Sequence, residues 1–162
     1  MSQRPTWRLL NSGPTDGYSN MAIDEAMLLA MQEGLIPPTL RIYAWQPACL
    51  SIGTFQSVAS DIDTEACAAQ NVDWVRRPTG GRAILHDREV TYSVVARQDD
   101  QRVAGDVMES YRRISLGLLE GLRLLGVQAV LAPSAIPPLP SGAPKPAACF
   151  AAPSLHEIMV DG

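Results

Sequence analysis

The sequence predicts an α+β or mixed-sheet domain, and two observations carry this prediction. Short apolar runs typical of strands arrive in adjacent groups, with helical patterns between only some of them, which favours this class over a doubly wound sheet. Hydrophobic residues make up 46% of the 162-residue chain, a share typical of a globular protein that buries a core. We therefore expect a single domain over residues 1–162.

Strands are expected where apolar and β-branched residues alternate or cluster over a few positions. The first is Thr6–Leu10, and a polar loop should follow it. The other expected strands are Leu40–Trp45, Cys49–Ile52, Asp73–Arg77, Ala83–Leu85, Glu89–Ala96, Val127–Leu131 and Glu157–Val160. The last one leads into Asp161-Gly162, a strong hairpin signal. A hairpin with one arm leaves an unpaired edge, so we expect a further segment to follow.

Helices are expected at three places where apolar residues recur every three or four positions. The first runs from about Met21 to Gln32, is capped by Ser19 or Asn20, and ends at Gly34. Its apolar face comprises Ile23, Ala26, Met27, Ala30 and Met31. The second begins at Asp61 and ends near Ala69. The third runs from Val107 to Leu125, with Val107, Tyr111, Ile114, Leu118, Leu122 and Leu125 on one face.

Composition excludes several classes of protein. The net charge of −4 gives no basic footprint for nucleic acid, and no run of about 18 apolar residues indicates a membrane span. The N-terminus lacks the apolar stretch of a secretory signal, so we expect a cytoplasmic protein with free thiols. Residues 132–148 are rich in Pro, Ala and Ser, which predicts a mobile loop within the domain.

The stretch Val75–Asp87, VRRPTGGRAILHD, concentrates ionisable groups and a glycine pair between two expected strands. Adjacent Arg76 and Arg77 would point to opposite faces of a strand. Gly80-Gly81 would let the backbone approach a ligand closely, and free amides there could hold an anionic or carbonyl oxygen. A polar hairpin with an exposed tip is the alternative interpretation.

The three cysteines differ in their surroundings. Cys149 lies among small residues in AACFAAPS, directly after the Pro-rich segment. A nucleophilic thiol needs a nearby cation, base or helix N-terminus to lower its pKa, and His156 is one candidate. Local context alone favours a packing role for Cys149. We expect Cys49, within an apolar strand, and Cys67, on a helix face, to be core residues.

Longer stretches of the sequence resemble a known family. WVRRPTGGRAILHDREVTYSVV resembles the signature of the biotin/lipoate protein ligase superfamily, and ACFAAPSLHEIMVDG resembles the segment around the acyl-accepting cysteine of its octanoyltransferases. NMAIDEAML, IPPTLRIYAWQPACLSIGTFQ and YRRISLGLLEGLRLLG are similar to the same group, in the same order. The resemblance implies a mixed, mainly antiparallel sheet flanked by helices, incomplete at the C-terminus.

The resemblance also implies a reaction without ATP or another cofactor. The catalytic Cys149 would take an octanoyl group from octanoyl-acyl carrier protein and pass it to a lysine of a lipoyl domain, such as the glycine-cleavage H protein. The implied substrate-binding residues are Arg76, Arg77, Gly80, Gly81, Arg82, His86 and Asp87. Among them, Asp87 is expected to orient the hairpin rather than to contact the substrate. No metal is implied.

The sequence departs from the family pattern at two points. The family strand that matches Glu157–Val160 continues to a lysine that positions the acyl carbonyl, and this chain ends before it; its only lysine is Lys145. The family also has aromatic residues where this chain has Leu155-His156. We therefore expect the chain alone to be inactive or to take up acyl groups slowly, unless a second chain supplies the missing part.

Three alternatives remain open. An ATP-dependent lipoate–protein ligase would need Mg²⁺, but those ligases commonly carry a third glycine where this chain has Arg82 and need no cysteine at position 149. A non-catalytic remnant that binds acyl groups or carriers is consistent with the missing lysine. A plain structural fragment would respond to no ligand.

Overall fold

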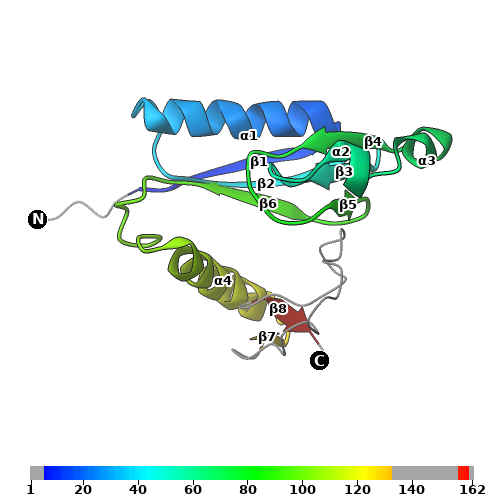
Figure 1. Cartoon of the computed structure of the whole chain (residues 1–162). Coiled ribbons are helices and arrows are strands. Elements are labelled where there is room, and N and C mark those ends of the chain that lie inside the picture. The colour runs from blue at the N-terminus through cyan, green and yellow to red at the C-terminus, as the bar shows by residue number, and fades with distance from the viewer. Residues whose placement is uncertain (1–5, 133–156, 161–162) are drawn as a thin grey trace, which may run out of the picture. The chain divides into compact units, whose positions relative to one another are not determined.

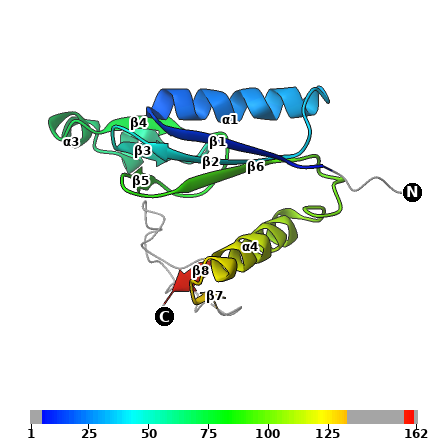
Figure 2. The same cartoon turned by 180° about the vertical axis from the view of Figure 1, so that it is seen from behind.

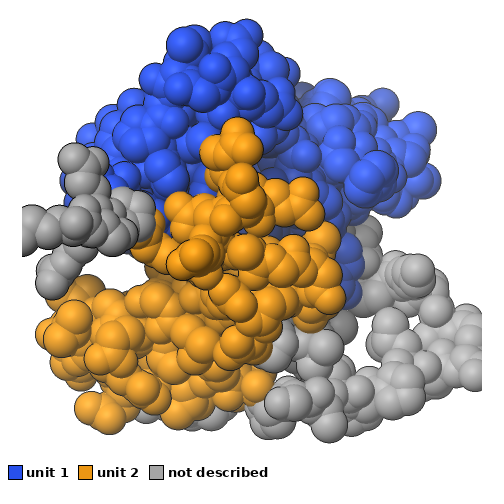
Figure 3. All heavy atoms as spheres, turned by 90° about the vertical axis from the view of Figure 1, so that its left-hand side faces the viewer, with its two compact units in different colours: residues 1–96, 146–150 blue, residues 97–145, 151–162 orange. Residues whose placement is uncertain are grey.

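The computed structural model describes residues 6–132 and 157–160. These residues form two compact units, which Figure 3 colours separately: residues 6–96 belong to the first, and residues 97–132 with 157–160 belong to the second. The predicted Pro-rich loop lies outside the described residues except for Ala132, and so does the Asp161-Gly162 turn.

Two three-stranded sheets and three helices build the first unit. Its elements are β1 (Arg8–Thr15), α1 (Gly17–Gln32), β2 (Thr39–Trp45), β3 (Cys49–Ile52), α2 (Val58–Asp61), α3 (Thr64–Ala69), β4 (Asp73–Arg76), β5 (Ile84–His86) and β6 (Thr91–Val95). In one sheet, β2 lies between parallel β1 and antiparallel β6. In the other, β3 lies between parallel β4 and antiparallel β5. Helix α1 covers one face of the first sheet, as Figure 1 and Figure 2 show from opposite sides.

Strand β1 is longer than the sequence predicts. The prediction of a polar loop after Leu10 is wrong, because the strand continues to pair with β2 as far as Thr15. The register shifts between Asn11 and Gly13, and Gly13 has a φ of 66°, which glycine adopts without steric cost. This irregularity lets polar residues continue a strand where their composition indicates a loop.

Helix α1 begins earlier than predicted and has a different cap. The cap is Asp16, whose carboxylate accepts a hydrogen bond from the Ser19 amide at 2.9 Å, so the assignment to Ser19 or Asn20 is wrong. The predicted end is confirmed. Gly34 has a φ of 71°, and the Leu35 amide donates to the Ala30 carbonyl at 2.8 Å, which closes the helix.

The helix predicted from Asp61 to Ala69 is instead two short helices. Helix α2 ends at Asp61, and Ile62 is extended. Asp63 then caps α3 by accepting from the Ala66 amide at 2.8 Å. Because a capping residue has non-helical backbone angles, this Asp63 cap interrupts the helix that the sequence pattern suggested.

The apolar core of the first unit consists of two clusters. Met27 and Met31 of α1 pack against Val95 of β6, so their predicted place on the core face is confirmed. Ala26, predicted on the same face, is exposed. The second cluster joins α1 and both sheets through Met21, Tyr43, Trp45, Cys49 and Val75.

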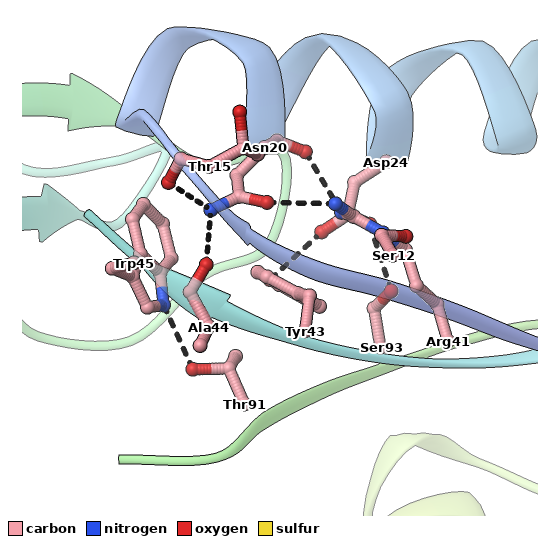
Figure 4. Close-up of polar contacts among 10 residues, drawn as sticks. All are labelled: Ser12, Thr15, Asn20, Asp24, Arg41, Tyr43, Ala44, Trp45, Thr91 and Ser93. Atoms are coloured by element: carbon pink, nitrogen blue, oxygen red, sulfur yellow. Dashed lines mark hydrogen bonds and ion pairs between the residues drawn. The ribbon is translucent and has the colours of Figure 1, made fainter. Parts of the chain in front are cut away.

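A buried polar network lies between α1 and the first sheet, as Figure 4 shows. Arg41 of β2 is fully buried, and its guanidinium forms an ion pair with Asp24 at 2.8 Å. The same guanidinium donates to the Asn20 side-chain oxygen at 2.7 Å and to the Ser12 hydroxyl at 2.9 Å. Its central carbon also lies 3.9 Å from the centre of the Tyr43 ring. Each of the three guanidinium nitrogens of Arg41 therefore donates a hydrogen bond.

Asp24 is the shared acceptor of this network. Its carboxylate also accepts from the Tyr43 hydroxyl at 3.0 Å and from the Ser93 hydroxyl at 2.8 Å. Burial of a charge is costly unless it is paired and hydrogen-bonded, and here both conditions are met. The network thereby fixes α1 to β2 and β6.

The second unit pairs one long helix with a two-stranded sheet. Its elements are α4 (Val107–Leu124), β7 (Ala129–Leu131) and β8 (Ile158–Val160). Asp106 caps α4 by accepting from the Glu109 amide at 2.8 Å. Strand β8 runs antiparallel to β7, with Ala129 opposite Val160.

The apolar face of α4 is centred differently from the prediction. Ser115 and Leu119 are its buried residues. Of the predicted residues, Val107 is 84% exposed and Leu125 is 80% exposed, because they stand at the first position and beyond the last. The central predicted residues Tyr111, Ile114, Leu118 and Leu122 are half-buried.

The predicted α+β class with a mixed, mainly antiparallel arrangement is confirmed. The pairs β2–β6, β3–β5 and β7–β8 are antiparallel, whereas β1–β2 and β3–β4 are parallel. Within residues 6–132 and 157–160, no helix has the length and apolar character that a membrane crossing requires.

Candidate functional site

The glycine turn between β4 and β5 packs directly onto the end of β3. The Arg77 amide donates to the Ile52 carbonyl at 2.9 Å, and the Thr54 amide donates to the Thr79 carbonyl at 3.0 Å. A Cβ atom at Gly53 would lie 2.0 Å from the Gly81 carbonyl oxygen. Gly53 is therefore required for this contact, although the sequence analysis did not single it out.

The two glycines of the turn have different surroundings. Gly81 has a φ of 94°, and a Cβ there would come within 2.9 Å of the Arg77 guanidinium. A Cβ at Gly80 would meet nothing closer than the Phe55 ring at 3.9 Å, an ordinary van der Waals contact, and Gly80 is exposed. The turn thus combines a constrained glycine with an accessible one.

Arg77 closes the turn through backbone carbonyls. One terminal nitrogen donates to the carbonyl and to the hydroxyl of Ser51, each at 3.1 Å. The other donates to the Gly80 carbonyl at 2.9 Å and to the Arg82 carbonyl at 2.7 Å. The structure therefore gives this guanidinium a framework role; its predicted contact with substrate stays a prediction.

Arg76 performs the same task for a neighbouring loop. One nitrogen of its guanidinium donates to the carbonyls of Gly53, Thr54 and Gln56, at 2.9, 3.1 and 2.8 Å. This brace holds the loop that carries Phe55, whose side chain is 93% exposed beside Gly80. The two adjacent arginines thus brace different segments, as expected for neighbours at the end of a strand.

His86 of β5 is buried and lies in a chain of polar groups. Its Nε2 is 2.7 Å from the Ser51 hydroxyl, and its Nδ1 pairs with Glu89. Its ring stacks on Trp45, with the ring centres 4.1 Å apart. Burial lowers the pKa of His86, because an imidazolium loses solvation there, although the hydrogen bond to Glu89 opposes this shift.

The two remaining predicted residues of this motif differ in their surroundings. Asp87 is exposed and pairs only loosely with Arg88, at 3.6 Å. The expected hairpin is wrong, because β4 and β5 lie on either side of β3 and do not pair with each other, so Asp87 has no hairpin to orient. Arg82 is half-buried, and its carbonyl accepts a hydrogen bond from the Arg77 guanidinium.

The cysteine prediction divides between described and undescribed residues. Cys149, the predicted nucleophile, lies outside the described residues, as do His156 and Lys145. Cys49 is fully buried, as predicted, and burial raises the pKa of its thiol to about 12. Cys67 is only half-buried, so its assignment to the core is wrong. A thiol with so high a pKa as that of Cys49 is inert at neutral pH.

Among the described residues, no three histidine, cysteine or acidic side chains gather as metal ligands. The chemistry that these residues offer is a braced glycine turn. Arg77 holds the backbone of the turn, Arg76 holds the neighbouring loop, a buried imidazole contacts Arg77 through Ser51, and Gly80 is exposed beside the Phe55 side chain. Such a turn is suited to holding a carbonyl or anionic oxygen without reorganisation.

Comparison with known proteins places this turn in a family. Residues 16–159 match the lipoyl protein ligase A/B catalytic domain. The chain is 51% identical over 158 residues to the octanoyltransferase LipM of Kyrpidia tusciae, and the alignment covers 97% of this chain and 58% of that protein. The chain therefore spans little more than half the length of this curated relative.

Solved structures agree with the sequence relatives. The crystal structure of lipoate-protein ligase A bound with ATP has a TM-score of 0.67 and 30% identity, over 78% of this chain and 49% of that one. A bi-partite lipoate protein ligase from Thermoplasma acidophilum, described with its E2 lipoyl domain, has a TM-score of 0.64 and 28% identity, over 80% of this chain and 49% of that one. The matched residues include the braced turn, and the chain belongs to the lipoyl protein ligase A/B catalytic domain family.

Proposed function

We propose that the chain serves as an octanoyltransferase of lipoate biosynthesis. The observation that carries this proposal is the 51% identity to a named octanoyltransferase over 97% of the chain. The matched range 16–159 contains both the turn around Gly80-Gly81 and Cys149. Support from the structure is indirect: Arg77 holds two carbonyls of the turn, and Gly80 and Gly81, where an acyl oxygen would need its donors, are exposed.

The proposed reaction has two acyl transfers. The Cys149 thiolate attacks the carbonyl carbon of octanoyl-acyl carrier protein, the thioester bond of the carrier breaks, and the carrier thiolate leaves and takes up a proton. A neutral lysine amine of the acceptor then attacks the new thioester, loses a proton, and expels the Cys149 thiolate. The incoming thioester is already activated, so the proposal includes no ATP, metal or other cofactor.

The residues of the turn have separate parts in this proposal. Amides near Gly80 and Gly81 hold the carbonyl oxygen as it gains negative charge. Arg76 and Arg77 keep those amides in place through the carbonyls that they bind. An apolar wall for the octanoyl tail would contribute about 0.8 kcal/mol per buried methylene.

The proposed partners are two carrier proteins. The donor is octanoyl-acyl carrier protein, and the acceptor is a lipoyl domain of the glycine-cleavage H protein type. The solved neighbour from Thermoplasma acidophilum, described with an E2 lipoyl domain, supports an acceptor of this class. A second chain is a further proposed partner, because that neighbour is a bi-partite ligase.

An ATP-dependent lipoate ligase is the second candidate. The similarity to lipoate-protein ligase A bound with ATP favours it. The two candidates differ in a property that can be measured without turnover: the ligase is stabilised by ATP with lipoate, whereas the transferase forms a covalent adduct from an octanoyl thioester alone.

The test combines mass spectrometry with thermal shift on the full 162-residue chain. Incubation with octanoyl-acyl carrier protein should slowly add one octanoyl group, which hydroxylamine removes and an added H protein accepts; full acylation followed by rapid transfer would refute the expectation that the chain alone is slow or inactive. Cys149→Ser should abolish the adduct, and Cys67→Ser should not. Stabilisation by ATP with lipoate and no adduct would select the ligase. Unchanged carrier binding by Cys149→Ser, with no acyl transfer by either protein, would indicate a non-catalytic remnant.

A further inference from the structure

A continuous chain of polar contacts runs behind the glycine turn. The Arg77 guanidinium contacts the Ser51 hydroxyl at 3.1 Å, that hydroxyl contacts His86 Nε2 at 2.7 Å, and His86 Nδ1 contacts the Glu89 carboxylate. Ser51 is 1% exposed and His86 is 5% exposed. The middle of this series of contacts is therefore buried, whereas Arg77 and Glu89 at its two ends are half-buried.

The direction of each hydrogen bond follows from the chemistry of the groups. A guanidinium has only donors, so the Ser51 oxygen accepts from Arg77. A carboxylate has only acceptors, so His86 Nδ1 carries the proton and donates to Glu89. In the neutral ring Nε2 then carries no proton and accepts from the Ser51 hydroxyl. Burial lowers the pKa of His86, which is consistent with this neutral form.

The constellation has the residue types of a hydrolytic triad but not its accessibility. A serine, a histidine and a carboxylate stand in the order found in such enzymes. Ser51, however, belongs to the central strand β3 and is almost completely buried, so its oxygen has no route to a substrate. The serine hydroxyl therefore serves as a link rather than as a nucleophile.

The far end of the chain is anchored in the other sheet. Glu89 also accepts from the Thr91 hydroxyl at 2.7 Å, and Thr91 in turn accepts from the Trp45 indole at 2.8 Å. The Trp45 ring stacks on His86 with an interplanar angle of 10°. Trp45 belongs to β2 and Thr91 belongs to β6. These polar contacts therefore connect the first sheet to the glycine turn between β4 and β5.

We propose that Ser51, His86 and Glu89 are positioning residues, which hold the Arg77 guanidinium in one orientation and thereby fix the Gly80–Arg82 backbone. Arg77 reaches the turn through the carbonyls of Gly80 and Arg82. Loss of the serine or the imidazole should therefore loosen the Gly80–Arg82 backbone through the Arg77 guanidinium. The inference rests on the proposed function only for its effect on acyl transfer.

The first test needs no variant. In the ¹⁵N-labelled parent chain, long-range ¹H–¹⁵N spectra distinguish the two neutral forms of an imidazole. His86 should carry its proton on Nδ1 at neutral pH, the reverse of the form that free histidine prefers. The signals of the other histidine are identified with His156→Gln. A proton on His86 Nε2 would overturn the inference.

The second test measures the turn in variants. Backbone order parameters at Gly80 and Gly81 should be about 0.85 in the parent and fall below about 0.6 in Ser51→Ala and His86→Ala. His86→Gln should restore them, because an amide can accept from Ser51 at the Nε2 position. Ser115→Ala is the matched control, a buried serine of α4 outside the chain of contacts. Unchanged order parameters in both alanine variants would contradict the inference.

A kinetic arm separates this inference from the proposed function. Ser51→Ala should slow acylation of Cys149 roughly 10- to 100-fold, with the KM for the carrier unchanged, because the misplaced turn affects the reacting carbonyl. If the parent forms no adduct while the order parameters behave as expected, the proposed function fails and the positioning role stands. If the parent is acylated and Ser51→Ala is equally fast, the positioning role fails alone.

Discussion

Replacement of Asp24 by alanine should destabilise the first unit severely. The change leaves the Arg41 guanidinium, which is 0% exposed, without its counter-ion, and it removes the acceptor of the Tyr43 and Ser93 hydroxyls. Breaking a buried ion pair from one side costs about 3–5 kcal/mol. We take the middle of that range and expect a loss of about 4 kcal/mol in the free energy of unfolding, to which the two hydroxyls left without an acceptor add a smaller amount.

The assay is urea unfolding followed by tryptophan fluorescence, because Trp7, Trp45 and Trp74 all belong to the first unit. A loss of 4 kcal/mol should lower the midpoint by about 2 M, for a slope of about 2 kcal/mol per M. Glu25→Gln is the matched control, an exposed acidic residue next to Asp24 on the same helix, and should have little effect.

A double-mutant cycle makes the Asp24 prediction sharper. In an Arg41→Met background, Asp24→Ala no longer strands a charge, so its cost should fall and give a coupling energy of about 2–3 kcal/mol. Equal costs in the two backgrounds, or a loss under about 1 kcal/mol in the single variant, would refute the reasoning.

Three further predictions test other features. Gly17→Ala should cost about 1–3 kcal/mol, because its Cβ would lie 2.4 Å from Cys49 Sγ, whereas Gly121→Ala in open space on α4 should stabilise; thermal unfolding by circular dichroism compares them. Iodoacetamide at pH 7 should modify Cys67 but not Cys49, whose pKa is raised to about 12, until urea is added; peptide mass spectrometry reads the sites, and rapid native labelling of Cys49 would be contrary. Burial lowers the pKa of His86, which lies between Arg77 and Glu89, so below about pH 6.5 the unfolded chain takes up the proton first and the free energy of unfolding should fall. If the parent loses no more stability over this pH range than His86→Gln does, the prediction is contradicted.

Much of the secondary structure could be predicted because local patterns decide it. The strand Cys49–Ile52 and the start of α4 at Val107 agree with the observed bounds. The longer β1 could not be predicted, since cross-strand pairing with β2 outweighs the local preference of its polar residues. The break at Ile62 also escaped prediction, because the Asp63 cap competes with an apparently continuous helical pattern.

The buried network was invisible for a different reason. Periodicity identifies buried positions by their apolar residues, and Arg41 and Asp24 are charged. Strand β2 buries Thr39, Arg41, Tyr43 and Trp45, while Leu40 and Ile42 on the other face remain half-exposed. The contacts of Arg41 with Asp24 and Asn20 of α1 explain why this side of the strand faces inward.

The candidate site was found only in part. The density of arginine, glycine and histidine in one stretch identified the turn, since those residues are neighbours in sequence. Ser51 belongs to β3 and Gly53 follows that strand, and the sequence does not distinguish Glu89 from an ordinary surface acid. Their contribution depends on the pairing of β3 with β5, which local sequence does not determine.

The central claim is that an octanoyl group on Cys149 is held at the glycine turn, and amide chemical shifts test it most directly. The ¹⁵N-labelled chain is acylated on Cys149, and its spectrum is compared with that of the unmodified chain. The account predicts that the largest changes fall on the amides of Gly80, Gly81 and Arg82, and that hydroxylamine reverses them. Changes confined to other parts of the chain, with these three amides unaffected, would contradict it.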